Sequence, residues 1–349
     1  MEQIKQLELL ADIGSSSGET EPVAVGPHRD GMSQRAGLEL SISESFSPDA
    51  TATLFLGDRL DLLEQIARSG QRAELVVTSP PYNMGKEYEE AISLPEYVAD
   101  QRRTIEACVS ILAPTGSLCW QVGHYIAGSG KNKEAFPLDI VLYPVFKEFH
   151  LKLRNRIVWY FGHGLHERVR FSGRHEAILW FTRDTEDYTF NLDPVRVPQK
   201  YPGKRAFRGP RKGQPSGNPL GKNPSDVWDI PNVKANHREK TFHPCQYPVA
   251  LVERLVLALT NEGDLVVDPY IGVGTTAVAA FIRGRRSAGA DTEARYLKVA
   301  RKRLVQAATG NLPVRPLNQP VYKPDQNLAI ARLPKEWTTE ASSENLENQ

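Results

Sequence analysis

Two short apolar runs, each ending at a distinctive turn, constrain the fold of this 349-residue chain more than any other feature. Residues 75–78 (Leu-Val-Val-Thr) precede a Ser-Pro-Pro-Tyr turn at 79–82, and residues 265–268 (Leu-Val-Val-Asp) precede a glycine-containing turn at 269–274. Apolar runs of this length that stop at turn residues are typical of buried strands in a parallel sheet. Because open α/β sheets bind ligands at the carboxyl ends of their strands, both turns are candidate functional segments.

Apolar runs alternate with amphipathic stretches along most of the chain, which predicts an α/β fold. The predicted strands lie near residues 52–57, 74–78, 116–122, 156–161, 176–182, 264–268 and 286–290. The predicted helices lie near residues 59–69, 96–112, 136–147, 247–260, 275–283 and 293–309. Alternation of this kind implies a largely parallel sheet with helices on both faces.

The Ser-Pro-Pro-Tyr turn combines stiffness with hydrogen-bond acceptors. Pro80 and Pro81 fix φ and remove two N–H donors, so the turn is rich in carbonyl acceptors. The Ser79 hydroxyl and a proline carbonyl suit an exocyclic amino group, and the Tyr82 ring suits stacking on a base. These are the requirements for methylating an amino nitrogen on a flipped-out base. Taken alone, the four residues are also compatible with an ordinary exit from a strand.

The second turn has the features of a nucleoside-binding segment. Gly272 and Gly274 allow the backbone to approach a ligand closely, and the helix start that follows presents free N–H groups. We expect Asp268 to bind a cationic α-amino group, and Asp291, after the next strand, to accept hydrogen bonds from two ribose hydroxyls. The spacing also fits a dinucleotide-binding fingerprint, since Asp291 follows Gly272 by 19 residues. An acid directly before the turn favours S-adenosylmethionine, because a carboxylate repels a pyrophosphate.

Together, the two turns resemble the motifs of amino-methylating DNA methyltransferases. That family carries a (D/N/S)-P-P-(Y/F) catalytic motif and an F-x-G-x-G cofactor motif on one Rossmann-like sheet. The order found here resembles the permuted group called the β class. Further segments that resemble those of the family lie at residues 56–58, 116–120, 174–181, 226–231 and 243–248. The resemblance covers roughly residues 51–306.

The resemblance implies a methyltransferase that uses S-adenosylmethionine and flips its target base out of double-stranded DNA. The implied catalytic residues are Ser79, Pro80, Pro81 and Tyr82. The implied cofactor-binding residues are Asp58, Pro244, Gln246, Asp268, Tyr270, Gly272, Gly274, Thr275, Thr276 and Asp291. Tyr270 replaces the Phe of the family, and Ile271 stands where the family often has a small residue. A side chain as large as Ile271 could crowd the turn, which leaves the shape of the pocket open.

A basic excursion at about residues 185–240 interrupts the predicted sheet. Residues 196–222 contain eight Lys or Arg and no acid, with Tyr201 and Phe207 interleaved. A solvated surface loop has a similar composition, but the position within a sheet that receives DNA favours phosphate contacts and base reading. The family has its target-recognition region in this interval. The residues that we expect to bind DNA are Lys200, Lys204, Arg205, Arg208, Arg211 and Lys212.

The two ends of the chain differ from its centre. Residues 1–50 carry nine acids and three bases with little periodicity, and we expect a mobile N-terminal extension there. The catalytic domain is expected at 51–312 and a polar C-terminal tail at 313–349. The first residues lack the pattern of a signal peptide, and no apolar run approaches the length of a membrane span. With the resemblance, this predicts a cytoplasmic, nucleoid-associated prokaryotic protein.

Its expected partners are double-stranded DNA and, in a restriction–modification setting, a cognate endonuclease that acts on the same site. We expect the protein to be a monomer or a homodimer. Cysteine and histidine spacing predicts no metal site, because no C-x-x-C pair occurs and no acid accompanies the histidines at ligand spacing. The residues considered are Cys108, Cys119, Cys245, His163, His166 and His175.

Two further residues have weaker patterns. Pro244-Cys245-Gln246 matches a tripeptide of cytosine-C5 methyltransferases, but it precedes the glycine turn here, and the E-N-V companion of that family is absent. We therefore do not expect Cys245 to act as a nucleophile. Glu176 is as compatible with satisfying backbone donors near a strand as with touching a ligand.

The target base follows from the first residue of the catalytic motif. In the family, Ser at this position accompanies mostly N4 of cytosine, and Asp or Asn mostly N6 of adenine. The Ser79 hydroxyl can also donate to the ring N3 of cytosine, which a carboxylate cannot do. We expect a cytosine-N4 methyltransferase, with an adenine-N6 enzyme as the alternative. A catalytically silent DNA-binding protein and a nicotinamide-dependent oxidoreductase remain, although the latter leaves the Ser-Pro-Pro-Tyr turn unexplained.

Overall fold

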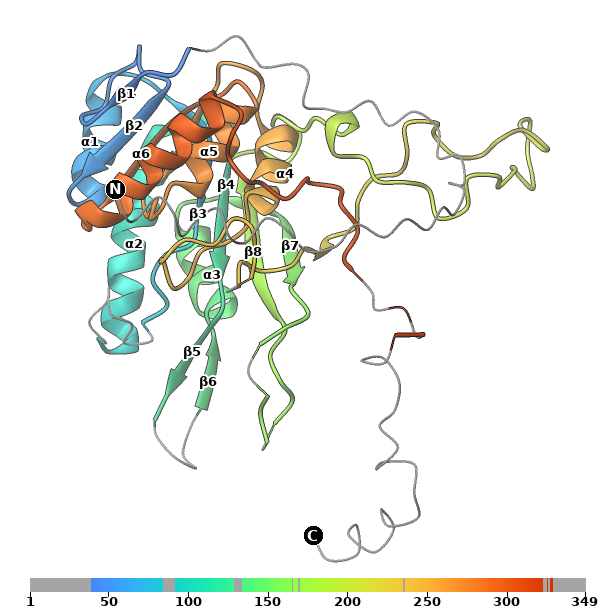
Figure 1. Ribbon diagram of the computed structural model, residues 1–349, viewed down its shortest axis with the longest axis horizontal. Coiled ribbons are helices and arrows are strands. Elements are labelled where there is room, and N and C mark those ends of the chain that lie inside the picture. Colours follow the sequence, from blue (N-terminus) through green and yellow to red (C-terminus); the bar gives the residue numbers. More distant parts are fainter. Residues whose placement is uncertain are drawn as a thin grey trace, which may run out of the picture. The chain divides into compact units, whose positions relative to one another are not determined.

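A nine-stranded sheet forms the centre of the computed structural model (Figure 1). The structure describes residues 39–83, 92–128, 134–164, 166–168, 170–234, 236–322, 325, 327 and 328. The strands of the sheet are β1 (Ile42–Ser43), β2 (Ala52–Leu56), β3 (Ala73–Thr78), β4 (Leu112–Val122), β7 (Lys152–Tyr160), β8 (His175–Thr182), β9 (Val227–Asp229), β10 (Leu265–Asp268) and β11 (Arg286–Asp291). A separate hairpin pairs β5 (His124–Ala127) with β6 (Glu134–Pro137).

Six α-helices and a short 3-10 helix complete the described secondary structure. They are α1 (Arg59–Arg68), α2 (Leu94–Ile111), α3 (Leu138–Glu148), η2 (Asp193–Val195), α4 (Val249–Leu259), α5 (Thr275–Ile282) and α6 (Ala294–Ala308). Two of the helix starts are fixed by side chains. The Asp58 carboxylate caps α1, and Ser93 with Glu96 forms a capping box at α2.

The strand order is β1-β2-β11-β10-β3-β4-β8-β7-β9, and the first six strands run parallel. β8 runs antiparallel to both β4 and β7, and β9 is parallel to β7. The predicted largely parallel α/β sheet is therefore confirmed. Because β8 is reversed, its first residues lie at the same edge as the last residues of β3 and β10.

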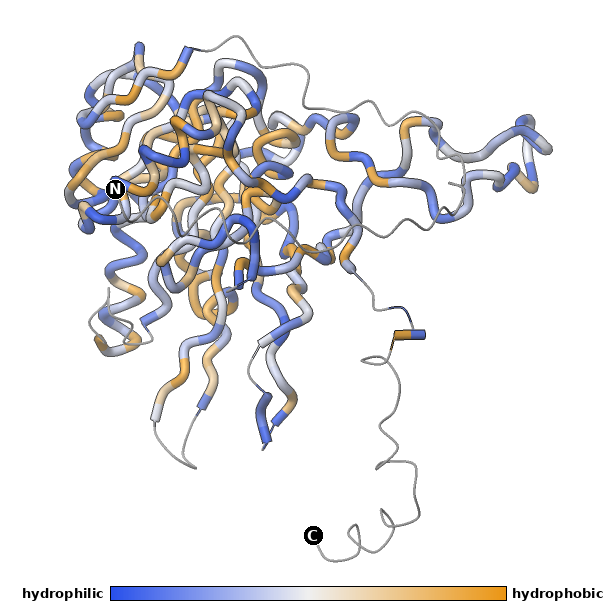
Figure 2. Tube along the Cα trace, in the orientation of Figure 1, coloured by the Kyte–Doolittle hydropathy of each residue, from blue (hydrophilic) through white to orange (hydrophobic). Residues whose placement is uncertain are grey.

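The sheet is covered by helices on both faces, as the alternation along its strands requires. Leu75 and Val77 of β3 face one hydrophobic cluster, which includes α4, α5 and α6. Val76 faces a second cluster, which includes α1, α2 and α3. Figure 2 shows the hydrophobic residues concentrated along the strands and the helices that pack on them.

Both predicted domain boundaries shift. β1 pairs with β2, so residues 42–43 belong to the sheet and not to a mobile extension that ends at 50. Near the other end, Leu317 lies in the core, and the buried Arg315 donates its backbone N–H to Glu239 at 2.9 Å. The expected start of a polar tail at residue 313 therefore falls within the packed part of the chain. Residues 1–38 and 329–349, to which the rest of those expectations apply, lie outside the described part of the chain.

The basic excursion forms an arm that we define as residues 196–222. Its two sides are joined by antiparallel bridges between Val197 and Lys222 and between Arg205 and Pro215. After the arm, β9 returns the chain to the edge of the sheet, a strand that the sequence pattern did not predict. In the described ranges, no helix is long and apolar enough to span a membrane.

Candidate active site

A cavity of about 510 Å³ opens at the carboxyl edge of the parallel strands. It is lined by residues that follow β2, β3, β10 and β11, together with residues of the loop before α4. Ten of the residues expected from sequence lie in its wall: Asp58, Ser79, Pro80, Pro81, Tyr82, Pro244, Gln246, Tyr270, Gly272 and Asp291. The two turns recognised in the sequence therefore share one cavity.

The Ser-Pro-Pro-Tyr turn forms one end of this cavity and is held by hydrogen bonds from its neighbours. The Ser79 Oγ atom lies 3.1 Å from the Tyr82 hydroxyl. That hydroxyl donates to the Glu176 Oε2 atom at 3.2 Å, and the Gln121 side chain donates to the same oxygen. Glu176 reaches the turn from the first residues of β8. The sequence left its role open, and the structure places its carboxylate in the cavity wall.

Burial changes the acidity of two of these groups. It raises the pKa of the Tyr82 phenol well above its usual range, so the phenol stays neutral near pH 7. It also raises the pKa of Glu176 to about 7, against the opposing effect of the hydrogen bonds from Tyr82 and Gln121. A carboxylate with this pKa exchanges protons readily at neutral pH.

Asn83, directly after the turn, was not singled out in the sequence. Its φ is 58°, a left-handed conformation that Asn adopts more readily than most residues. Its buried side chain donates to the Ile92 carbonyl at 2.5 Å and accepts from the Ile92 N–H at 2.8 Å. Asn83 thereby joins the chain after the turn to the start of the segment that leads into α2.

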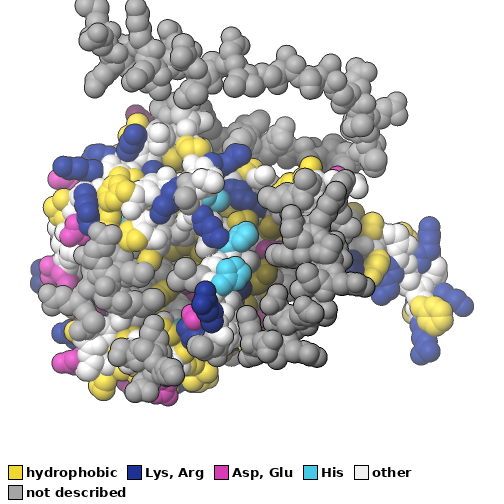
Figure 3. Space-filling view, turned by 60° about the horizontal axis from the view of Figure 1, so that its bottom comes forward, with side chains coloured by type: hydrophobic (Ala, Val, Ile, Leu, Met, Phe, Trp, Pro, Cys, Tyr) yellow, Lys and Arg dark blue, Asp and Glu magenta, His cyan; other side chains and the backbone are white. Residues whose placement is uncertain are grey.

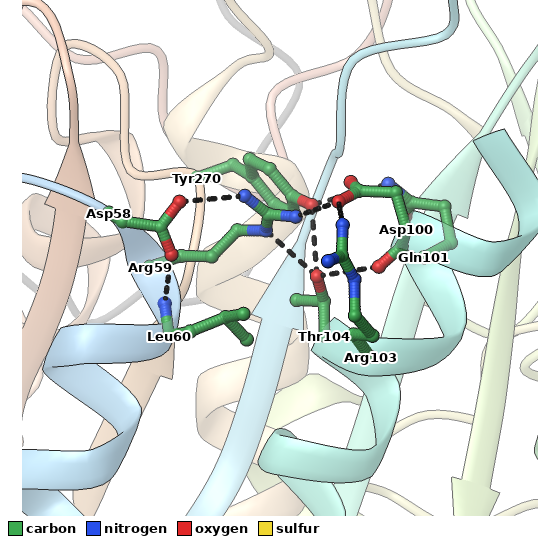
Figure 4. Close-up of polar contacts among 8 residues, drawn as sticks. All are labelled: Asp58, Arg59, Leu60, Asp100, Gln101, Arg103, Thr104 and Tyr270. Carbon is green, nitrogen blue, oxygen red and sulfur yellow. Dashed lines mark hydrogen bonds and ion pairs between the residues drawn. The ribbon is translucent and has the colours of Figure 1, made fainter. Parts of the chain in front are cut away.

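Tyr270 forms part of the other end of the cavity, within a polar network (Figure 4). Its hydroxyl lies 3.2 Å from both the Thr104 Oγ1 and the Gln101 Nε2 atoms, and the Arg59 guanidinium lies 5.2 Å from its ring centroid. Burial raises the pKa of Tyr270 to about 12. The hydroxyl that distinguishes Tyr270 from the Phe of the family therefore has partners on α2.

Arg59 links the carboxylates beside this ring. It contacts Asp58 Oδ2 at 3.1 Å and Asp100 Oδ1 at 2.5 Å, and its Nε donates to Thr104 at 2.8 Å (Figure 4). Asp100 also accepts from Arg103 at 2.7 Å. Arg59 and Asp100 had no sequence signal of their own, because their importance depends on the packing of α1 against α2.

Asp291 and Gly272 lie side by side in the cavity wall. The Gly272 N–H donates to Asp291 Oδ2 at 3.1 Å, and the Glu293 N–H donates to Oδ1 at 2.8 Å. Gly272 has a φ of +50°, and a Cβ atom there would lie 3.4 Å from the His243 ring. Burial raises the pKa of Asp291 to about 6, so it is ionised at neutral pH and can accept hydrogen bonds.

Asp268 is not in the cavity wall, which differs from the expected contact with an α-amino group. Its side chain is fully buried, and burial raises its pKa. Oδ1 accepts from the Thr78 hydroxyl at 2.6 Å and from the Tyr270 N–H at 3.1 Å. Oδ2 accepts from Tyr247 at 2.9 Å and from Thr276 at 2.6 Å. In this geometry Asp268 ties β3, β10, α5 and the loop before α4 together behind the cavity.

The start of α5 is also behind the wall, so Gly274, Thr275 and Thr276 do not line the cavity. A Cβ atom on Gly274 would lie 2.6 Å from the Cβ of Ala300, so this glycine permits α6 to pack closely. The Thr275 hydroxyl accepts from Arg303 at 3.0 Å, while Thr276 bonds Asp268. These residues position the turn from behind instead of facing a ligand.

Ile271 does not line the cavity, which answers the question that the sequence left open at this position. Its side chain is buried and points at β11, where a Cβ atom on Gly289 would lie 2.3 Å from the Ile271 Cδ1 atom. Because Gly289 has no side chain, the Ile271 side chain can fill this space.

The loop before α4 is fixed by two buried polar side chains. Gln246 accepts from the Thr241 hydroxyl at 2.8 Å and donates to the Glu239 carbonyl at 2.8 Å. The Glu239 carboxylate accepts from the Val249 N–H at 2.8 Å. Pro244 and Cys245 lie between these anchors and reach the cavity. Gln246 thus touches the cavity, while its amide holds the loop.

The chemistry of the wall fits S-adenosylmethionine better than a dinucleotide. Five carboxylates line the described cavity, and its Arg59 is already paired with two of them. The carboxylates are those of Asp58, Asp100, Glu176, Asp291 and Glu293. They attract the cationic groups of S-adenosylmethionine and repel a pyrophosphate. No group of residues that could hold a metal ion occurs among the described side chains.

The six basic residues expected to bind DNA lie on the arm and not in the cavity. All are exposed, and Figure 3 shows Lys and Arg side chains gathered on the projecting arm. They are Lys200, Lys204, Arg205, Arg208, Arg211 and Lys212. Phe207 is 81% exposed among them.

Comparison with known proteins places these features in a family. Residues 73–302 match a family model described as DNA methylase, for N6 and N4 methyltransferases. The chain is 47% identical over 259 residues to the type II methyltransferase M.BglII of Bacillus subtilis. The aligned region covers 74% of this chain and 70% of M.BglII. The chain is 32% identical over 256 residues to the DNA adenine methyltransferase YhdJ of Escherichia coli, covering 72% and 82%.

Solved structures show the same fold. A DNA modification methylase from Thermus thermophilus in complex with S-adenosyl-L-methionine matches with a TM-score of 0.52 and 26% identity, over 74% of this chain and 94% of that one. The cytosine-N4-specific PvuII DNA methyltransferase matches with a TM-score of 0.56 and 20% identity, over 75% and 92%.

Proposed function

We propose that this chain, which belongs to the N6/N4 DNA methylase family, methylates the exocyclic N4 of cytosine in double-stranded DNA. It is a DNA methyltransferase that depends on S-adenosylmethionine. The finer assignment rests chiefly on one observation. Ser79, and not an acid or amide, lines the cavity at the end of β3, with its hydroxyl 3.1 Å from that of Tyr82.

An aromatic exocyclic amine is a poor nucleophile because its lone pair is delocalised into the ring. Hydrogen bonds from the amine to Ser79 Oγ and the Pro80 carbonyl favour a pyramidal nitrogen and direct its lone pair along the cavity. The Tyr82 ring stacks on the flipped base while its hydroxyl is held from behind. Orientation of this kind contributes about 7–11 kcal/mol toward lowering a barrier.

The cofactor supplies a methyl group carried on a positively charged sulfur. Asp291 would accept hydrogen bonds from its ribose, the Tyr270 ring would pack on its adenine, and the nearby carboxylates would offset its positive charge. Asp268 acts indirectly, by keeping the two motif-bearing strands in register.

Cytosine is favoured over adenine by the serine at position 79. A hydroxyl accepts from an amino group and donates to the adjacent ring nitrogen, which is N3 in cytosine and N1 in adenine. The choice of cytosine therefore rests on the family pattern, in which Ser at this position accompanies mostly N4 of cytosine. Relatives of this chain include an adenine enzyme and a protein of the same fold described as cytosine-N4-specific. The serine is therefore the argument for cytosine, and adenine N6 is the second candidate.

We further propose that the arm contacts the duplex. Its exposed cations and lack of acids suit phosphate binding, and its separation from the cavity suits reading of neighbouring base pairs. Several relatives are type II methyltransferases. We accordingly propose a restriction–modification role in the cytoplasm at the nucleoid, beside a cognate endonuclease, for a monomer or homodimer.

The test is to incubate the protein with unmethylated DNA and methyl-labelled S-adenosylmethionine, digest the DNA, and separate the nucleosides by mass. N4-methylcytosine is the expected product. N6-methyladenine would overturn the choice of base. Absence of labelled nucleosides across DNA of varied sequence, despite cofactor binding, would instead indicate a catalytically silent DNA-binding protein.

A further inference from the structure

Hydrogen bonds connect the catalytic turn to a partly buried carboxylate, that of Glu176. Ser79 Oγ lies 3.1 Å from the Tyr82 hydroxyl, which donates to Glu176 Oε2 at 3.2 Å. The side-chain amide of Gln121 donates to the same carboxylate oxygen. Because both neighbours of Oε2 are donors, the arrangement suits an ionised Glu176.

The backbone makes room for this contact. Gly123, just after β4, packs against both Tyr82 and Glu176. A Cβ atom on Gly123 would lie 3.1 Å from the Tyr82 ring and 3.4 Å from Glu176 Oε1. Glu176 itself is fixed by strand pairing, since it stands opposite Trp159 in the register of β7 and β8. The carboxylate is therefore held beside the phenol by the sheet and not by a flexible loop.

The proposed reaction needs a proton acceptor that the turn does not contain. After the amino nitrogen gains a methyl group it carries an extra proton, and neither a serine hydroxyl nor a proline carbonyl is basic enough to keep it. We propose that Ser79, Tyr82 and Glu176 form a proton relay that removes this proton, with Glu176 as its terminal acceptor. This inference rests on the proposed function, in that an amino nitrogen of a base is methylated.

The proton transfers balance along the relay. The Ser79 O–H first turns from the ring nitrogen of the base to the Tyr82 oxygen. The N–H bond of the methylated amine then breaks and its proton passes to Ser79 Oγ, as the serine proton passes to the Tyr82 oxygen. The tyrosine proton passes to Glu176 Oε2, which becomes a carboxylic acid. Ser79 and Tyr82 end as they began, no electrons are exchanged, and Glu176 returns its proton to water after the product leaves.

The electrostatics of the cavity agree with these roles. The high pKa of Tyr82 prevents a lasting phenolate, so this residue transmits the proton without keeping it. The pKa of Glu176, about 7, leaves a large ionised fraction at neutral pH and makes the carboxylate more basic than an exposed one. The other titratable groups that share the cavity are Asp58, Arg59, Tyr97, Asp100, His243, Cys245, Tyr247, Tyr270, Asp291, Glu293 and Tyr296, and His175 adjoins Glu176 in the chain.

The test compares pH profiles of single-turnover methyl transfer at saturating cofactor and DNA. The wild-type rate is expected to rise with pH through about 7, as Glu176 becomes ionised. Glu176→Gln keeps the shape of the side chain but cannot accept the proton. We expect this variant to be about 10²-fold slower at pH 7.5, the lower end of general-base contributions, and to lose the rise with pH. Cofactor and DNA affinities should stay unchanged.

A second variant distinguishes a relay from a structural contact. Tyr82→Phe keeps the ring but removes the hydroxyl between Ser79 and Glu176, and it should also lose the rise with pH. Since both changes interrupt one relay, the double variant should be no slower than the slower single variant. Glu74→Gln is the matched control, because burial also raises the pKa of Glu74, which lies at the opposite end of β3. Its profile should match the wild type.

Persistence of the pH dependence in Glu176→Gln, or multiplied effects in the double variant, would overturn the relay. The identity of the methylated nucleoside is read from the same digests. N6-methyladenine would overturn the choice of cytosine, while the pH profiles would still decide on the relay, because either amine must lose a proton.

Discussion

The cavity and the arm use charge in opposite ways. In the cavity wall the charged groups are partly buried, and several have defined partners, as Arg59 does between Asp58 and Asp100. On the arm, every Lys and Arg side chain except that of Arg196 is exposed, and no acid lies within the segment. Partly buried, paired charges hold a fixed geometry, whereas exposed cations respond to a polyanion and to salt. We therefore expect substitutions in the cavity to affect methyl transfer and cofactor binding, and substitutions on the arm to affect DNA binding.

The largest effect is expected at the catalytic turn. Ser79→Ala removes the hydroxyl that would accept from the target amine, and we expect methyl transfer to fall about 10²–10³-fold, as for loss of one aligned catalytic hydrogen bond. Cofactor binding, measured by calorimetry, should persist. A fully active variant would remove Ser79 from the mechanism.

Asp268→Ala should destabilise the framework behind the cavity. Four donors would lose their acceptor, and each buried donor left unpaired costs about 1–3 kcal/mol, so we expect a loss of about 3 kcal/mol or more. Denaturant unfolding measures this loss, with exposed Glu262→Ala as the control. Cofactor binding should weaken in parallel. Unchanged stability with lost cofactor binding would favour the direct contact that the sequence suggested.

The arm should affect DNA binding alone. Replacing Arg205, Arg208 and Arg211 with Ala should weaken DNA binding and reduce the slope of log K against log salt by about 0.9 for each lost phosphate contact. Cofactor affinity should stay the same, as fluorescence titrations in parallel would show. If the slope of log K against log salt did not change, these three side chains would make no phosphate contacts.

Cofactor affinity should depend on pH through Asp291. Its pKa in the protein is about 6, so the carboxylate that accepts from ribose hydroxyls is ionised above this pH and protonated below it. Affinity should therefore fall as pH drops through 6, by up to about tenfold per unit. Calorimetry across this range on Asp291→Asn should show weaker binding without the pH dependence. If that variant retained the dependence, another group would be responsible.

The smallest effect is expected from Tyr270→Phe. It restores the family residue but removes the hydroxyl contacts with Gln101 and Thr104, at a cost of about 1 kcal/mol. Cofactor affinity should change only a few-fold, because the ring remains. A much larger loss would show that the hydroxyl itself holds the ligand.

Most of the framework could be predicted from sequence, because local patterns determine it. The apolar runs of the central strands and the amphipathic helices were correctly located, and both turns share the cavity. β9 is only three residues long and has no pattern of its own, and the β5–β6 hairpin depends on pairing that a local window does not reveal.

The site was predicted less completely, because the type of a residue does not show where its side chain points in the folded protein. Asp268 and Asp291 both end apolar strands, yet one faces inward to four donors and the other reaches the cavity. Glu176 had no distinguishing spacing, because its proximity to Tyr82 arises from the reversal of β8. Such relations are set by tertiary packing.

The pair formed by Ile271 and Gly289 couples two positions that are distant in sequence. They share a volume that only one side chain can occupy, since Ile271 fills the space that a Cβ on Gly289 would need. Enlarging residue 289 alone should push the cofactor turn outward, and trimming residue 271 alone should leave a void. Substitutions at residues 271 and 289 should therefore be made in pairs, so that the size of one side chain compensates for the size of the other.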